Sequence, residues 1–119
     1  MVKNILLVED EAIIALDISL ELEMGGFKVF SVDNGEAALE VVANEDIDLA
    51  VLDIKIKGNL TGVDVFLKIR ELGIPAVFST ANIDILSKSE AEFDFEAKYI
   101  KKPFNVNELR QIIDDLNLE

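Results

Sequence analysis

Five short, largely apolar runs constrain the fold of this chain more than any other feature. They cover residues 5–8, 29–32, 49–52, 76–79 and 99–100. Continuous rather than alternating hydrophobicity indicates strands that are covered on both faces, as in a parallel sheet. The segments between them carry residues typical of helix starts and helix ends, so strand and helix alternate along the chain. This order predicts one domain, residues 1–119, with an α/β fold: a three-layer, doubly wound sandwich whose five-stranded parallel sheet has helices on both faces.

Capping residues mark where three of the helices begin. Asn34, Thr61 and Asn105 are of the types that accept a hydrogen bond from the first turn of a helix. Asp64 and Glu108 follow the last two caps at the spacing of a capping box. The last helix has the clearest apolar stripe, made by Val106, Leu109, Ile112, Ile113 and Leu116.

The first helix is less clearly encoded, because residues 18–24 alternate with the period of a strand. The helix is favoured because Ile13, Leu16, Leu20 and Met24 line one helical face and two glycines follow at 25 and 26.

Composition excludes several functions. The formal net charge is −13, from 24 acidic and 11 basic residues, and it would repel nucleic acid and anionic membranes. Without histidine the chain has no imidazole base and cannot be a histidine kinase or phosphotransfer module, and without cysteine it has no thiolate site. The apolar run 5–8 is too short for a signal peptide or a membrane span. We expect a cytoplasmic protein with no nucleic-acid or membrane partner.

Reactive side chains follow four of the five predicted strands, at the edge where parallel sheets bind ligands. They are Glu9, Asp10, Asp53, Thr80 and Lys102. Three neighbouring carboxylates repel one another unless a cation lies among them, and an all-oxygen ligand set suits Mg²⁺. Lys102 is the basic neighbour that we expect there.

Each of these residues has an ordinary explanation when taken alone. Glu9 and Asp10 could belong to a solvated first helical turn, Asp53 to a strand-end turn, Thr80 to a polar loop and Lys102 to the charged surface. Their joint placement instead favours a phosphoryl acceptor, in which a carboxylate beside Mg²⁺ is the nucleophile while a lysine and a hydroxyl stabilise the transferring oxygens.

Four segments resemble the response-regulator receiver family in order and spacing, and the resemblance covers essentially the whole chain. They are residues 6–11 (LLVEDE), 48–53 (DLAVLD), 75–81 (PAVFSTA) and 99–104 (YIKKPF). The resemblance implies a flavodoxin-like receiver fold. It also implies that Glu9, Asp10, Asp53 and the backbone carbonyl of Lys55 hold Mg²⁺, and that Asp53 is the phosphoacceptor.

The resemblance extends to a conformational switch. Thr80 would hydrogen-bond a phosphoryl oxygen, Lys102 would pair with another, and Tyr99 would change rotamer with the state. A cis peptide is expected before Pro103. The output would lie on the fourth helix, fifth strand and fifth helix, with the weakly patterned residues 84–96 as the moving part.

The same resemblance indicates the partners. A sensor histidine kinase or a histidine phosphotransfer protein would supply the phosphoryl group, and an unnamed downstream protein would read the result. The domain would catalyse its own Mg²⁺-dependent phosphorylation and dephosphorylation rather than act as an enzyme on a separate substrate. Homodimerisation through the fourth and fifth helices is left open.

Two departures from the family pattern stand out. Lys57 occupies the usual proline position four residues after Asp53, and Gly62 comes nine rather than eight residues after it. The loop 55–62 is therefore one residue longer and more basic than usual. Before the last strand, a glycine-alanine pair is replaced by residues 96–97 (EA).

Three other functions are compatible with parts of this pattern. A flavodoxin-type cofactor binder needs a glycine- and hydroxyl-rich phosphate loop after the first strand, where residues 9–11 are all acidic. A haloacid-dehalogenase-type phosphatase needs a second carboxylate two residues after the nucleophile, where Lys55 stands. A receiver-like module that binds proteins without phosphorylation is the third, and the intact set of five side chains argues against it.

Overall fold

A computed structural model describes residues 2–80 and 98–116 of the chain. Its elements are β1 (Asn4–Val8), α1 (Ala12–Met24), β2 (Lys28–Val32), α2 (Gly35–Asn44), β3 (Leu49–Asp53), α3 (Gly62–Glu71), β4 (Ala76–Thr80), β5 (Lys98–Lys101) and α5 (Val106–Asp115). All strand pairs are parallel, in the order β2-β1-β3-β4-β5. The predicted switch segment 84–96 lies outside the described residues.

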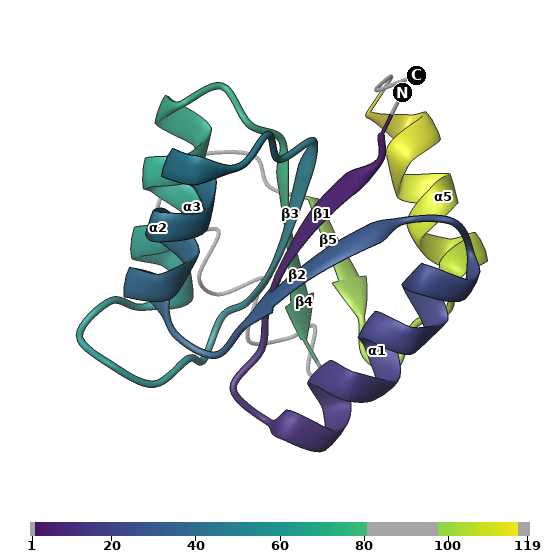
Figure 1. Cartoon of the computed structure of the whole chain (residues 1–119), viewed down its shortest axis with the longest axis horizontal. Helices are drawn as coiled ribbons and strands as arrows, with labels where there is room; N and C mark the ends of the chain where they lie inside the picture. The colour runs from purple at the N-terminus through teal and green to yellow at the C-terminus, as the bar shows by residue number, and fades with distance from the viewer. Residues whose placement is uncertain (1, 81–97, 117–119) are drawn as a thin grey trace.

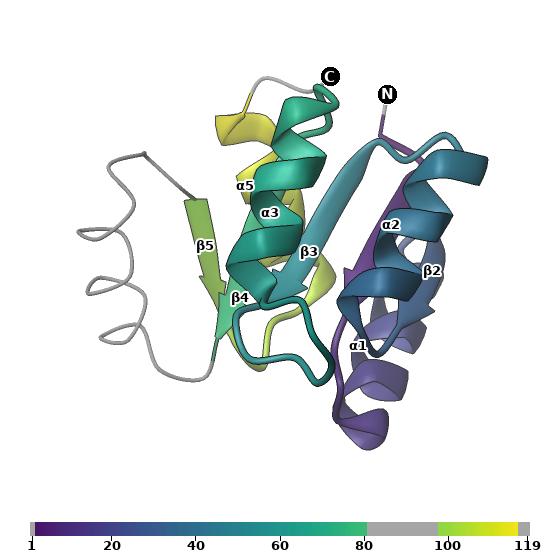
Figure 2. The same ribbon diagram turned by 90° about the vertical axis from the view of Figure 1, so that its left-hand side faces the viewer.

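Two apolar layers hold the helices against the sheet. Alternate residues of the central strands point to opposite faces, so Leu7 and Val51 pack with α1 and α5, whereas Leu6 and Leu52 pack with α2 and α3. Figures 1 and 2 show these two helical layers on either side of the strands. All of β3 is buried, which is why its sequence is apolar without alternation. The predicted three-layer α/β sandwich is confirmed.

The three predicted helix caps are present. The Asn34 side chain accepts a hydrogen bond from Ala37 N–H at 2.8 Å. Thr61 and Asp64 form a reciprocal capping box, with bonds of 3.1 and 2.9 Å. Asn105 accepts from Glu108 N–H at 2.9 Å. Each cap satisfies a backbone donor that a helix leaves unpaired, and so fixes where the helix begins after the strand.

The first helix forms as predicted, but its apparent apolar stripe faces outward. Ile13 and Met24 are 84% and 88% exposed, and Leu16 and Leu20 are also exposed. The inward face is made by Ala15, Ile18, Ser19 and Leu22. The strand-like alternation of residues 18–24 arises because residues 18 and 22 belong to the inner face, and residues 20 and 24 to the outer one. The helix has two apolar sides, and only one of them packs on the sheet.

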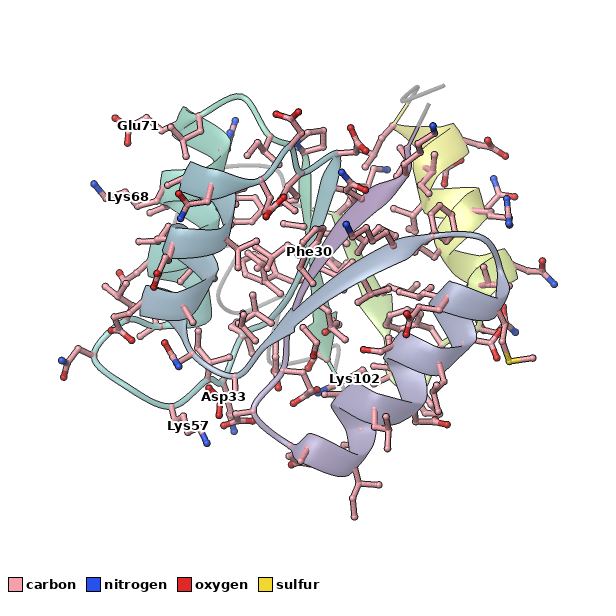
Figure 3. The ribbon with its side chains drawn as sticks, viewed as in Figure 1. Phe30, Asp33, Lys57, Lys68, Glu71 and Lys102 are labelled. Carbon is pink, nitrogen blue, oxygen red and sulfur yellow. The ribbon has the colours of Figure 1, made fainter. Side chains whose placement is uncertain are left out.

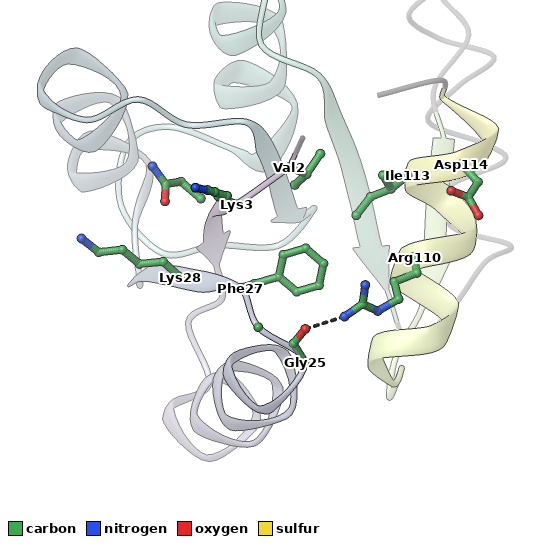
Figure 4. A pocket seen from close by; sticks show the side chains of 10 residues that line it. Val2, Lys3, Gly25, Phe27, Lys28, Arg110, Ile113 and Asp114 are labelled. Atoms are coloured by element: carbon green, nitrogen blue, oxygen red, sulfur yellow. Dashed lines mark hydrogen bonds between the residues drawn. The ribbon is translucent and has the colours of Figure 1, made fainter. Parts of the chain in front are cut away.

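Polar contacts join the end of α1 to α5. The Arg110 guanidinium lies 5.1 Å from the centre of the Phe27 ring and donates a hydrogen bond to the Gly25 carbonyl. Figure 4 shows this contact at the mouth of a hollow that Val2 and Ile113 also line. The Val106 N–H donates to the Glu21 carboxylate at 3.1 Å. These contacts hold α5 against the end of α1. They thereby position the start of α5, which directly follows the loop that carries Lys102.

Candidate functional site

An acidic cluster lies at the carboxyl edge of the sheet. Glu9 and Asp10 directly follow β1, and Asp53 is the last residue of the neighbouring β3. One carboxylate oxygen from each lies within 4.8 Å of the other two. Glu9 is 1% exposed and Asp53 is 8% exposed, whereas Asp10 is half-buried. The burial of Glu9 excludes the reading of this residue as part of a solvated helical turn.

Lys102 enters this cluster from the loop after β5. Its ammonium nitrogen lies 2.6 Å from Glu9 Oε1 and 3.1 Å from Asp53 Oδ2. Its backbone N–H donates to the Thr80 carbonyl at 2.7 Å, which continues the β4–β5 ladder one residue beyond the strand. The peptide between Lys102 and Pro103 is cis, as the family resemblance implied. Lys102 therefore bridges the carboxylates of two strands.

The electrostatics of the cluster follow from burial and from this bridge. Burial raises the pKa of Glu9 above its usual 4.5, against the opposing effect of the Lys102 hydrogen bond. For Lys102 burial acts against the charged form, but hydrogen bonds to Glu9 and Asp53 outweigh it and raise its pKa above 10.5. Lys102 is thus firmly protonated and serves as the counter-cation of Glu9, whose carboxyl group burial makes costly to ionise.

Backbone groups orient the two buried carboxylates. Glu11 N–H donates to Glu9 Oε2, and Lys55 N–H donates to Asp53 Oδ1, both at 3.1 Å. Gly62 packs so closely that an added Cβ would clash with the Asp53 carbonyl and lie 2.7 Å from the Ile54 Cα. A glycine is therefore required where α3 begins behind Asp53. The side chain of Lys55 is exposed, but its backbone lies beside the Asp53 carboxylate.

The two predicted switch residues lie on the neighbouring strands. Thr80 ends β4 and is 5% exposed. Tyr99, on β5, is half-buried, pairs in register with Phe78 of β4 and packs against the apolar layer that includes α2 and α3. Both positions are close to the site in the sheet, and their role in switching stays a prediction.

The donor set of the cluster fits a hard divalent cation. Three carboxylates offer oxygen ligands with no nitrogen or sulfur among them. Their mutual repulsion requires a cation, a role that Lys102 fills in the structure described. A metal ion would therefore meet preformed oxygen ligands and an ammonium group that already contacts two of them.

Two contacts were not predicted. The sequence placed Lys102 at this edge but did not show that it would contact Glu9 directly. It also gave no role to Asp33, which forms an ion pair with Lys57 at 2.9 Å. A signal was present, because Asp33 follows the end of β2 just as Glu9 follows the end of β1.

Comparisons with known proteins identify the family of this chain. The response regulator receiver domain family matches residues 5–114. The uncharacterized transcriptional regulatory protein YrkP of Bacillus subtilis (strain 168) is 34% identical, over 92% of this chain and 47% of that protein. Response regulator ArlR of Staphylococcus haemolyticus is also 34% identical, over 89% of this chain and 48% of that protein. The chain spans about half the length of these curated relatives.

Solved receiver structures have the same fold. The response regulator TrrA of Thermotoga maritima, in complex with Mg²⁺ and BeF, has a TM-score of 0.79 at 32% identity, covering 96% of this chain and 98% of that one. A CheY-like receiver domain protein of Methanospirillum hungatei has a TM-score of 0.80 at 26% identity, covering 99% and 94%.

The doubly wound fold and its acidic edge define a phosphoacceptor domain of two-component signalling. The chain belongs to the response regulator receiver domain family. Within residues 2–80 and 98–116, no helix has the length and apolar character needed to cross a membrane.

Proposed function

We propose that Asp53 accepts a phosphoryl group from a phosphohistidine of a sensor histidine kinase or a histidine phosphotransfer protein. The observation that carries this proposal is the environment of the Asp53 carboxylate. It is largely buried, it lies 3.1 Å from the Lys102 ammonium, and it shares an edge of the sheet with Glu9 and Asp10. A buried carboxylate between a cation and two acids is suited to a reaction that brings a phosphoryl group and a metal together.

Mg²⁺ is the cofactor proposed for this reaction. Glu9, Asp10, Asp53 and the backbone carbonyl of Lys55 would hold it, and it would neutralise charge on the transferring phosphoryl oxygens. The Mg²⁺–BeF complex of the relative TrrA supports this choice of ion.

The chain's own residues would divide the transfer among them. One Asp53 oxygen forms the new O–P bond as the P–N bond to the donor imidazole breaks, and the leaving imidazole takes a proton from solvent. The Lys102 ammonium group already lies 3.1 Å from Asp53. It would form an ion pair with a phosphoryl oxygen, and its ion pair with Glu9 would weaken. The Thr80 hydroxyl would donate to another phosphoryl oxygen.

The domain would act as a switch rather than as an enzyme on a separate substrate, catalysing only its own phosphorylation and dephosphorylation. Movement of Thr80 toward the phosphoryl group would give the Tyr99 ring a second position, and so change a surface that a downstream protein reads. Phosphorylation can shift this equilibrium only by its differential affinity for the two states. The net charge of −13 favours a protein over nucleic acid as the direct partner, and a cytoplasmic location suits a kinase donor.

Intact mass spectrometry tests the proposal. Incubation with a small acyl phosphate and Mg²⁺ should add one phosphoryl group that hydroxylamine removes, and EDTA should prevent the addition. Asp53→Asn should abolish the mass increase, and Lys102→Ala should slow it. Asp17→Asn, at an exposed position on α1, is the matched control and should react like the wild type. An undiminished adduct on Asp53→Asn would refute the assignment.

A further inference from the structure

The long basic loop after β3 makes a contact that the proposed phosphoryl transfer does not use. The Lys57 ammonium lies 2.9 Å from Asp33 Oδ2, on the turn between β2 and α2. Both side chains are more than half exposed, at 59% and 53%. Figure 3 shows the pair at the same end of the molecule as Lys102.

The loop has supports that do not depend on this ion pair. Backbone pairing joins Asn34 to Lys57 as an isolated parallel bridge. Gly58 has a φ of +101°, and an added Cβ would lie 3.1 Å from the Glu36 carboxylate. At the far end, the Thr61 capping box fixes the start of α3. Because an exposed ion pair shifts a local equilibrium by about fivefold at most, these contacts should keep the loop in place without it.

The pair lies beside the acidic cluster. Asp33 and Lys57 line the same surface hollow as Glu9 and Asp10. The pKa of Lys57 is raised, mainly by its hydrogen bond to Asp33 and to a smaller extent by the charge of Asp10. The sequence predicted Lys102 as the one basic neighbour of these carboxylates. In the structure Lys57 is a second cation near them, on the solvent side.

We propose that Asp33 and Lys57 form a charge-balanced pair that sets the Mg²⁺ affinity of the acidic cluster. Lys57 opposes the charge of the incoming ion, and Asp33 offsets Lys57 and holds its ammonium group away from Asp10. The inference rests on the proposed function in one respect only, namely that Glu9, Asp10 and Asp53 bind Mg²⁺. Neither residue of the pair is a ligand; both act on the metal through their charge.

The size of the effect follows from Coulomb's law. A unit charge about one Debye length, ~10 Å, from a divalent ion changes its affinity by about twofold at moderate ionic strength. Lys57→Gln should therefore tighten Mg²⁺ binding by about twofold. Asp33→Asn should weaken it by at least as much, since the released ammonium group would turn toward Asp10. The double variant should return close to the wild-type affinity.

Opposite signs separate this proposal from a purely mechanical role of the pair. If the ion pair only held the loop in position, each single substitution would break it and both would weaken Mg²⁺ binding. The double variant would then be no better than either single one. Lys57→Arg keeps the charge and should bind like the wild type. Lys68→Gln makes the same charge change at the far end of α3, where Figure 3 labels it, and should have little effect.

Calorimetric titration of the full chain with MgCl₂, at low and high ionic strength, tests the proposal without a phosphodonor. Opposite shifts for Lys57→Gln and Asp33→Asn that shrink as salt is added would support it. A wild-type chain that binds Mg²⁺ while Lys57→Gln binds it equally or more weakly would overturn this inference and leave the proposed function standing. A wild-type chain that binds no Mg²⁺ would overturn both.

Discussion

Replacement of Lys102 by methionine should destabilise the metal-free protein and make its stability depend on Mg²⁺. Methionine keeps most of the aliphatic length of lysine and removes the ammonium group. The Glu9 and Asp53 carboxylates, now 2.6 and 3.1 Å from that group, would lose their shared cation. Both are largely buried, so solvent could not replace it fully.

The expected cost can be bounded from the structure. Removal of one partner from a buried ion pair typically costs ~3–5 kcal/mol. The lower end applies because the pKa of Glu9 is already raised by burial, so the carboxyl group can take up a proton instead of remaining as an unpaired charge. A loss of ~3 kcal/mol corresponds to a fall in Tm of roughly 12 °C for a domain of this size.

Mg²⁺ should reverse most of this loss. A ligand at one hundred times its dissociation constant stabilises the folded state by about 2.7 kcal/mol. In the wild type the ion must compete with the Lys102 ammonium for Glu9, whereas in Lys102→Met it meets the carboxylates without that competitor. The variant should therefore gain more stability from the same Mg²⁺ concentration.

Urea unfolding followed by far-ultraviolet circular dichroism, with EDTA or with Mg²⁺, measures both effects. Lys101→Met is the matched control, because Lys101 is the preceding residue and its side chain is exposed. It should change stability by less than about 0.5 kcal/mol, as surface substitutions usually do. If Lys102→Met lost no more than this control, or if its deficit were the same with and without Mg²⁺, the bridging role of Lys102 would be refuted.

Three further predictions concern the site and the core behind it. The Mg²⁺ dissociation constant should rise as pH falls, beginning above pH 4.5, because protons compete for Glu9 at its raised pKa; affinity that stays constant down to pH 4.5 in calorimetry would contradict this. Gly62→Ala should cost about 2 kcal/mol in urea unfolding and slow phosphorylation of Asp53, because the new Cβ would clash with the Asp53 carbonyl; unchanged stability and rate would show that α3 can shift freely. Phe66→Ala should lower the free energy of unfolding by ~3–5 kcal/mol, since Phe66 is 4% exposed and its ring centre lies 4.6 Å from that of Phe78. A loss below about 1 kcal/mol in urea unfolding would mean that neighbouring side chains fill the space.

Local signals explain why so much of the fold could be predicted. The caps at Asn34, Thr61 and Asn105 act within one helical turn, so the residues that make them are adjacent in sequence. The strands could be recognised because burial on both faces removes alternation. Convergence of Glu9, Asp10 and Asp53 followed from topology alone, since the carboxyl ends of parallel strands share one edge.

Contacts that depend on side-chain reach or loop path could not be predicted in the same way. The direct bond between Lys102 and Glu9 depends on how far a flexible side chain extends across the sheet edge. The Asp33–Lys57 pair depends on the course of a loop that is longer than the family pattern. The side of α1 that packs on the sheet could not be predicted, because both of its sides are apolar. Periodicity identified a helix without showing which side is buried.

The exposed apolar residues of α1 are hydrophobic but contribute little to the stability of the fold. Ile13 and Met24 are more than four-fifths exposed and release little apolar area from water when the chain folds, so they contribute little of the ~1.5–3 kcal/mol that a buried side chain of this size provides. Replacing them with polar residues would therefore change the surface of the folded protein far more than its stability.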